Sequence, residues 1–178
     1  MAYARNQTST APGPRFPGDG PRIVTPTRTA ALSVTRFAPT TFDDGLIAGM
    51  PADDAHLILF QLRAHPAHDF WVDGKYAPAE SAPRATLSIF DLADEPYGRL
   101  THPVDTLMFH IPKLVLTEIA EDAGARAIST LNAPDGWSTH DPLVSQLQDF
   151  LVAALSGPAQ SSQLLQDHVM LGLGAHFA

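Results

Sequence analysis

The stretch between residues 31 and 111 alternates apolar and polar positions with a period of two, the pattern of β-strands that bury one face. Leu32–Phe37 follows this alternation closely. The run from Leu57 to Phe60 is apolar on both faces, which is typical of a strand covered from both sides. Asp73 and Gly74 tolerate the positive φ angles of a tight hairpin turn. Further strands are expected within 68–72, 75–77, 85–91 and 104–111, and this spacing predicts a sandwich or a barrel.

After residue 111 the apolar period changes from two to about 3.6, which predicts helices. Pro112 suits the first turn of a helix, and Gly124 is a natural stop. Asp141 followed by Pro142 predicts a second helix, because a carboxylate N-cap and an early proline both favour initiation. A third helix is expected to begin at Ser162 or the serine before it. The absence of a helical pattern before residue 112 argues against alternating βαβ units.

The predicted third helix carries apolar residues on two neighbouring faces. One face contains Leu165, Val169, Gly172, Leu173 and His176, and the other contains Leu164, His168, Leu171 and Ala175. A helix that is apolar on two faces has two surfaces to cover, and one barrel covers only one of them. The second helix is one candidate for the other surface. The alternative that we favour is a homodimer, with an interface that includes Leu164, Leu165, His168, Val169 and Leu171.

Charge and composition divide the chain unevenly. Residues 1–30 are rich in proline and glycine without any apolar period, which predicts a flexible arm. Residues 1–36 carry a net charge of +4, whereas the remainder carries −12. Because phosphate binding needs clustered Lys and Arg, the folded part of this chain is not expected to bind DNA directly.

Several classes of protein are excluded or disfavoured by composition. The 178 residues are enough for one domain with a core. The absence of cysteine excludes disulfides, thiolate metal sites and cysteine nucleophiles. The first ten residues lack the apolar region of a signal peptide, and no apolar run approaches the roughly 18 residues of a membrane span. We therefore expect a cytoplasmic protein without membrane contact.

Five segments, taken together and in this order, resemble the N-terminal domain of AraC-family transcription regulators: Asp54–Arg63, Phe70–Gly74, Leu87–Leu92, Phe109–Pro112 and Asp167–Phe177. The resemblance implies a mainly β fold, a cupin-like double-stranded β-helix barrel, followed by three α-helices. It places the barrel at residues 31–111 and the helical, dimerising segment at 112–178. In this family the domain binds a small effector or mediates dimerisation.

Family members continue into two helix-turn-helix units rich in Arg and Lys, for which this sequence offers no counterpart. The resemblance therefore implies the effector-sensing and dimerisation half of a bacterial regulator without its DNA-binding half. On this interpretation the chain is not an enzyme, needs no cofactor and does not bind DNA by itself.

A metal-dependent cupin-fold enzyme is the alternative, since the chain has eight histidines. Catalytic metal sites need two or three imidazoles that converge on one face, usually with a carboxylate. No His-x-His pair occurs here, and His65 and His68, beside a predicted turn, are not expected to share a strand face. We therefore predict no metal ligands and no catalytic residues.

An effector pocket, if the barrel forms one, is expected to be mostly apolar with a few polar groups that orient the ligand. Polar or aromatic residues within the strand patterns are the candidates. Arg63 is further expected either to pair with an acid such as Asp91 or to bind a carboxylate. The predicted effector-binding residues are Gln61, Arg63, Trp71, Ser88, Phe90 and His110.

Overall fold

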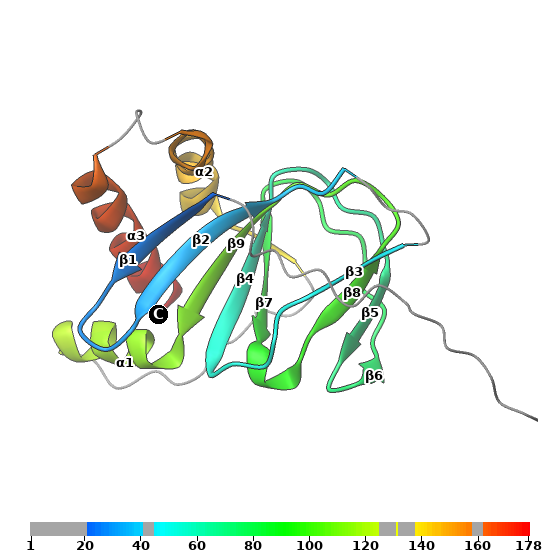
Figure 1. Ribbon diagram of the computed structural model, residues 1–178, viewed down its shortest axis with the longest axis horizontal. Helices are drawn as coiled ribbons and strands as arrows, with labels where there is room; N and C mark the ends of the chain where they lie inside the picture. Colours follow the sequence, from blue (N-terminus) through cyan, green and yellow to red (C-terminus); the bar gives the residue numbers. More distant parts are fainter. Residues whose placement is uncertain (1–20, 41–44, 125–130, 132–137, 158–161) are drawn as a thin grey trace, which may run out of the picture.

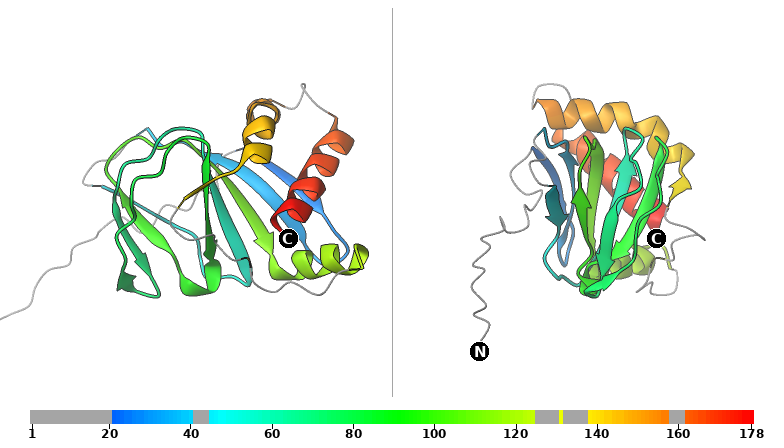
Figure 2. Two further views of the ribbon diagram at one scale, coloured as in Figure 1. Left: turned by 180° about the vertical axis from the view of Figure 1, so that it is seen from behind. Right: turned by 90° about the vertical axis from the view of Figure 1, so that its right-hand side faces the viewer.

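Two antiparallel sheets and three α-helices make up the part of the chain that this computed structural model describes, residues 21–40, 45–124, 131, 138–157 and 162–178. The helices lie against the face of one sheet that points away from the other sheet (Figures 1 and 2). The first sheet contains, in order, β1 (Arg22–Pro26), β2 (Ala31–Phe37), β9 (Thr106–Pro112), β4 (Ala55–Gln61), β7 (Thr86–Asp91) and β10 (Thr139–His140). The second contains β3 (Leu46–Gly49), β8 (Tyr97–Leu100), β5 (Asp69–Val72) and β6 (Lys75–Tyr76).

This architecture confirms the predicted fold class, a mainly β, cupin-like domain followed by three helices. The doubly apolar run on β4 lies in the middle of the six-stranded sheet and is covered on both faces, as its sequence predicts. Asp73 and Gly74 adopt φ angles of 51° and 67° in the turn between β5 and β6, which confirms the predicted hairpin.

The three helices begin at or within one residue of the predicted positions, with Pro112 preceding the first as its N-cap residue. They are α1 (Lys113–Asp122), α2 (Pro142–Ser156) and α3 (Gln163–Phe177). Gly124 follows α1 with a φ of +65°. The Asp141 carboxylate accepts a hydrogen bond from the Val144 amide at 2.9 Å, and the Ser162 hydroxyl accepts one from the Leu165 amide at 3.3 Å. Within the described ranges, no helix combines the length and apolarity that a membrane span requires.

Two strands lie outside the predicted barrel segment of 31–111. Strand β1 falls inside the segment predicted to be a flexible arm, and β10 falls between two predicted helices. Ile23 and Thr25 are buried, and Ile23 pairs with Val34 of β2. This short alternation of buried and exposed residues was not predicted, because prolines surround it. Pro26 is tolerated because β1 is an edge strand. The rest of the predicted arm, residues 1–20, lies outside the described residues.

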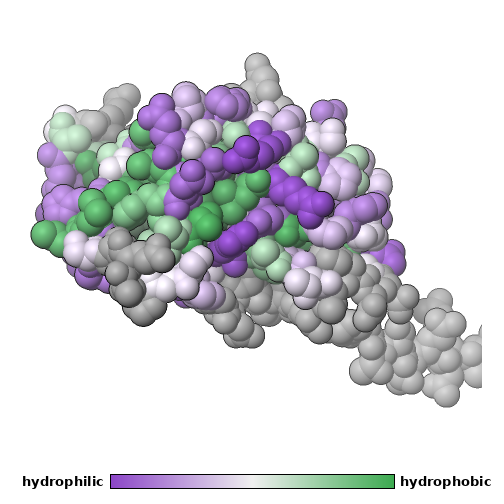
Figure 3. Space-filling model, turned by 90° about the horizontal axis from the view of Figure 1, so that it is seen from above, coloured by the Kyte–Doolittle hydropathy of each residue, from purple (hydrophilic) through white to green (hydrophobic). Residues whose placement is uncertain are grey.

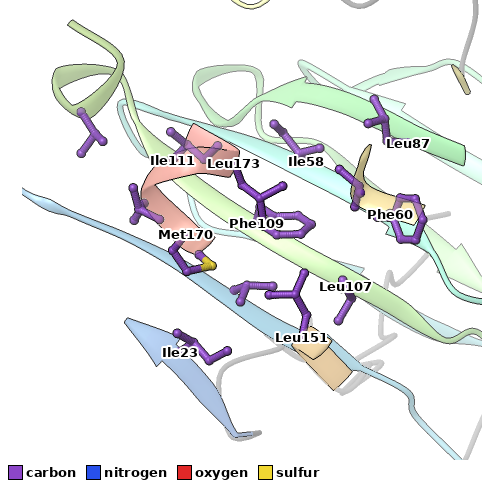
Figure 4. Close-up of a cluster of buried hydrophobic side chains, with 14 of the residues drawn as sticks. Ile23, Ile58, Phe60, Leu87, Leu107, Phe109, Ile111, Leu151, Met170 and Leu173 are labelled. Atoms are coloured by element: carbon purple, nitrogen blue, oxygen red, sulfur yellow. The ribbon is translucent and has the colours of Figure 1, made fainter. Parts of the chain in front are cut away.

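The main core fills the space between the six-stranded sheet and the helices. Side chains from β4 and β9 meet side chains from α2 and α3 there, and β1 adds Ile23 at the edge (Figure 4). Phe60 and Phe109 are the largest of its fully buried residues. The helices contribute Val115, Leu116, Val144, Leu151, Ala154, Leu155, Met170 and Leu173 to this core. Burial of these side chains fixes the helices on one face of the sheet and leaves the other face for a separate site.

Candidate ligand-binding site

A cavity of about 100 Å³ lies between the two sheets. Its walls come from β2, β4, β7 and β9 on one side and from β3, β5 and β8 on the other, with the segment between His65 and Ala82 contributing as well. A single water needs about 10–15 Å³ on this kind of measure, so the cavity has room for several waters or one small molecule.

Strand geometry explains why the cavity and the helical core can share one sheet. On β4, Leu57, Leu59 and Gln61 line the cavity, whereas the intervening Ile58 and Phe60 pack into the core beside the helices. Strands β7 and β9 alternate in the same way. The six-stranded sheet is therefore a single wall with the cavity on one face and the helices on the other.

Polar groups are few in the cavity, and they are held in place. The Gln61 carbonyl oxygen accepts a hydrogen bond from the Thr106 hydroxyl at 2.9 Å, and both residues are buried. The rings of His65 and His68 lie 4.2 Å apart between centroids. Backbone pairing holds both histidines in place. The amide and carbonyl of His65 both hydrogen-bond to the backbone of Ala82, and those of His68 to the backbone of Ala79.

The two histidines are uncharged near neutral pH. Burial of the ring, reinforced by the neighbouring His68 and His102, lowers the pKa of His65 from 6.5 to about 4. Burial also lowers the pKa of His68, against the opposing effects of the Pro66 carbonyl and Asp69. No lysine or arginine lines the cavity among the described residues. The site is thus a mostly apolar cavity whose buried polar groups are neutral, with the exposed Glu80 as its one carboxylate.

Three of the six predicted effector-binding residues, Gln61, Ser88 and Phe90, line the cavity, and three do not. Arg63 is exposed on the loop after β4. Trp71 lies outside the lining and stacks on Tyr97, with ring centroids 5.0 Å apart. His110 also lies outside it, and its Nε2 is 2.8 Å from the Asp53 carboxylate.

The predicted pairing of Arg63 with Asp91 is wrong. The Asp91 carboxylate instead lies 2.9 Å from the ammonium group of Lys113, which also pairs with Asp54 at 3.2 Å. Asp91 is at the end of β7, and Lys113 follows β9, so the turn into α1 brings the lysine to this acid.

His65, His68 and Phe70 line the cavity but were not among the predicted residues. Phe70 and Trp71 are adjacent aromatics on β5, so alternation alone gives no choice between them. His65 and His68 share no strand face, as expected, but both line the cavity from isolated bridges to Ala82 and Ala79, which the sequence did not predict.

Gly98 on β8 makes room for these side chains. A Cβ atom at this position would lie 3.2 Å from the His68 ring and 3.3 Å from the Phe70 ring. A glycine inside a strand often marks such a close approach, and this is the signal in the sequence that points toward the missed residues. No group of three or more His, Asp or Glu residues suited to a metal ion occurs in the described part of the chain.

The predicted dimer residues lie along α3. Leu164, Leu165 and Leu171 are 67%, 49% and 39% exposed, His168 is exposed and Val169 is half-buried. The buried stripe of the helix consists of Met170, Leu173 and Gly174, whereas Leu165 and Gly172 face solvent. Figure 3 shows apolar side chains gathered on the upper face of the molecule, toward its helical side.

The fold is that of a cupin-like domain with appended helices, and the cavity between its sheets is the candidate ligand-binding site. No protein-family model and no curated protein matches the sequence. Among solved structures, the chain is similar to the AraC-like transcriptional activator CuxR, with a TM-score of 0.51 and 10% identity over 82% of this chain. It spans about half of that activator, 51% of the CuxR chain, and at this identity the likeness shows the fold alone.

Two weaker similarities are to a single cupin and to an enzyme. An RmlC-like cupin protein from Desulfovibrio desulfuricans aligns with a TM-score of 0.35 and 15% identity, over 63% of this chain and 98% of that one. An oxalate decarboxylase aligns with a TM-score of 0.30 and 16% identity, over 67% of this chain and 35% of that one.

Proposed function

We propose that this chain is the regulatory part of an AraC-type transcription regulator, which binds a small effector in the cavity and self-associates through α3. The observation that carries the proposal is the six-stranded sheet with a cavity on one face and three helices on the other. The fold shared with an AraC-like activator supports it. The proposal gives the cavity a binding role with no catalytic step, and it implies a cytoplasmic protein.

The six-stranded sheet, which borders both the cavity and the helices, could couple effector binding to the position of α3 and hence to self-association. Gln61 and Met108 line the cavity, and their sequence neighbours Phe60 and Phe109 lie in the core that supports the helices. Any adjustment of β4 or β9 around a ligand moves both sets of side chains, because close-packed cores transmit small displacements. An effector that favours one arrangement of the sheet would thereby favour one placement of α3.

The exposed leucines of α3 support the proposed self-association. Leu164 and Leu171 lie seven residues apart, two helical turns along one face, and both are exposed. A contiguous exposed apolar stripe is typical of a protein–protein contact. A two-fold symmetric pair would cover the stripes of both protomers.

Analytical ultracentrifugation at micromolar concentration tests this contact. We expect a dimer for the original chain and a monomer for Leu164→Glu and Leu171→Glu, because each change introduces a charge into an apolar interface. Tyr76→Glu is the control, since Tyr76 is 59% exposed on β6 of the other sheet. A monomeric original chain, or dimers of both leucine variants, would contradict the proposed interface.

Direct DNA binding is not part of this function, because the chain after residue 36 carries a net charge of −12. We propose that this part of the protein forms mixed dimers with a regulator that carries a DNA-binding half, and that these dimers bind the operator more weakly. A gel-shift titration at about 150 mM salt tests this. We expect no specific complex with the chain alone and weakened operator binding when it is mixed with a full-length relative. Specific binding by the chain alone would overturn the first part, and failure to co-purify with the relative would overturn the second.

A further inference from the structure

We propose that the ligand of the cavity is an uncharged, largely apolar molecule of about the size of one six-membered ring, with a hydroxyl group that donates a hydrogen bond to Nε2 of His68. This inference rests on the proposed function, because it names the chemical class of the effector.

The lining of the cavity excludes a charged ligand. Most of it is apolar, with Leu59, Phe70, Phe90 and Met108 among the contributing side chains. An ionised carboxylate or ammonium moved into such surroundings loses its hydration and needs an opposite charge in return. No lysine or arginine of the described chain lines the cavity to pair with an anion. The one lining carboxylate, Glu80, would repel an anion, and because it is exposed and screened by water it stabilises a cation little.

The polar group of the ligand is specified by His68. Nδ1 of His68 lies 3.3 Å from the carbonyl oxygen of Pro66, and a carbonyl only accepts, so Nδ1 carries the proton. A neutral imidazole with a proton on Nδ1 presents Nε2 as an acceptor. Nε2 lies on the side of Gly98, which also lines the cavity. A ligand that reaches this atom must therefore bring a donor, and a hydroxyl group is the uncharged donor that suits apolar surroundings.

The volume sets the size of the ligand. Apolar cavities on the order of 150 Å³ accept benzene, and this cavity measures about 100 Å³ with further space at its mouth. A single ring is therefore close to the upper limit of what the cavity holds without rearrangement. Larger ligands would require the two sheets to move apart.

Three single-ring probes test the class at pH 7 by ligand-observed NMR titration: phenol, toluene and benzoate. We expect phenol to bind about tenfold more tightly than toluene, and benzoate to show no saturable binding. Benzoate binding as tightly as phenol would overturn the inference about charge. Phenol binding no more tightly than toluene would overturn the hydroxyl contact, and the absence of phenol binding to the folded protein would overturn the whole inference.

Variants identify the contact. His68→Phe keeps an aromatic ring and removes the acceptor, so we expect it to lose the preference for phenol over toluene. The same exchange at the exposed His140 should leave that preference unchanged. Leu59→Trp fills the cavity and should abolish binding of both probes. If His68→Phe does not fold, the ¹⁵N shift of His68 Nε2 in the original protein gives the answer, because phenol must move it and toluene must not.

The oligomeric state, measured on the same samples, separates this inference from the proposed function. A dimer that binds no phenol contradicts the ligand class and leaves the regulatory function standing. A strict monomer that binds phenol contradicts self-association and leaves the ligand class standing.

Discussion

The rings of His65 and His68 lie against each other on the wall of the cavity, with centroids 4.2 Å apart and planes tilted by 50°. Both rings are held by antiparallel backbone bonds to the segment at 79–82. Two imidazoles at this distance cannot both be charged at low cost, since burial already disfavours the protonated form of each. The pair therefore links the state of the cavity to the acidity of the solution.

The stability of the fold should fall as the pH drops from 6.5 to about 4. The pKa of His65 is 6.5 in an ordinary environment and about 4 in the folded chain, so the unfolded chain binds a proton that the folded chain refuses over this window. Urea unfolding at pH 7, 5.5 and 4.5 measures the effect. His65→Gln should flatten the pH dependence in that range, and an unchanged slope would contradict the role of His65.

Glu118 should support the fold above pH 4.5 and cease to do so as the pH falls toward 2. Its carboxylate accepts backbone hydrogen bonds from Arg28 at 2.8 Å and Thr29 at 3.1 Å, which hold the β1–β2 turn on α1. These bonds, the Arg28 amide first, lower the pKa of Glu118 from 4.5 to about 2. We expect Glu118→Gln to lower the urea midpoint at pH 7, with a difference that shrinks as the pH falls through this window.

The control for Glu118 is Glu121→Gln on the same helix. Glu121 is 64% exposed at its side chain and contacts Arg28 at 3.9 Å, a distance at which an exposed ion pair contributes little. If both changes lower the urea midpoint equally, the loss of one negative charge on α1 explains the effect, and the buried contact of Glu118 with the β1–β2 turn does not.

Asp141 should contribute to stability through two contacts. One carboxylate oxygen caps α2 through the Val144 amide, and the other lies 2.7 Å from Nε2 of His176 at the end of α3. Asp141→Ala should cost about 1 kcal/mol for the cap alone. Asp141→Asn preserves an N-cap acceptor and removes the charge, so thermal unfolding of the two variants separates the cap from the His176 contact. Equal losses in both would contradict a capping role.

Two glycines of α3 should respond in opposite directions. A Cβ atom at Gly172 would point into open space, with no contact to another element within 4 Å, so Gly172→Ala should stabilise the helix by about 0.5–1 kcal/mol. A Cβ at Gly174 would lie 2.9 Å from Cδ1 of Ile119 and 3.5 Å from Cδ2 of Leu32. Gly174→Val should therefore destabilise the fold by about 1–3 kcal/mol through overpacking. Thermal unfolding of both variants is the measurement, and a stabilising Gly174→Val would contradict the packing of α3.

Periodicity and cap residues predicted well those elements of the fold that obey a local rule. The Asp73–Gly74 turn and the caps at Asp141 and Ser162 depend on neighbouring residues, and all three are found. Strand β1 was missed because the prolines around Ile23 resemble those of a flexible tail. Its partner is the next strand along the chain, where Ile23 pairs with Val34, so the missed signal was the short hairpin that joins β1 to β2.

The site was harder to predict, because it depends on which face of each strand points inward. Gln61 was correctly expected to line the cavity, but alternation could not choose between Phe70 and Trp71 on β5. His65 and His68 lie outside the named strands, and only their bridges to a segment more than ten residues away orient them. Contacts of that kind are invisible to any pattern within a short window.

The strand order also has a consequence for how the chain folds. In the six-stranded sheet only β1 and β2 are neighbours in both sequence and space, whereas β2 places Ser33 opposite His110 of β9. Non-local pairing of this kind is typical of chains that fold in milliseconds to seconds. At a translation rate of about 5–20 residues per second, β2 would wait several seconds on the ribosome for β9. During synthesis, β2 and β4 thus expose apolar side chains and unpaired strand edges, which favour aggregation, until Thr106–Pro112 has emerged from the ribosome and can pair with them.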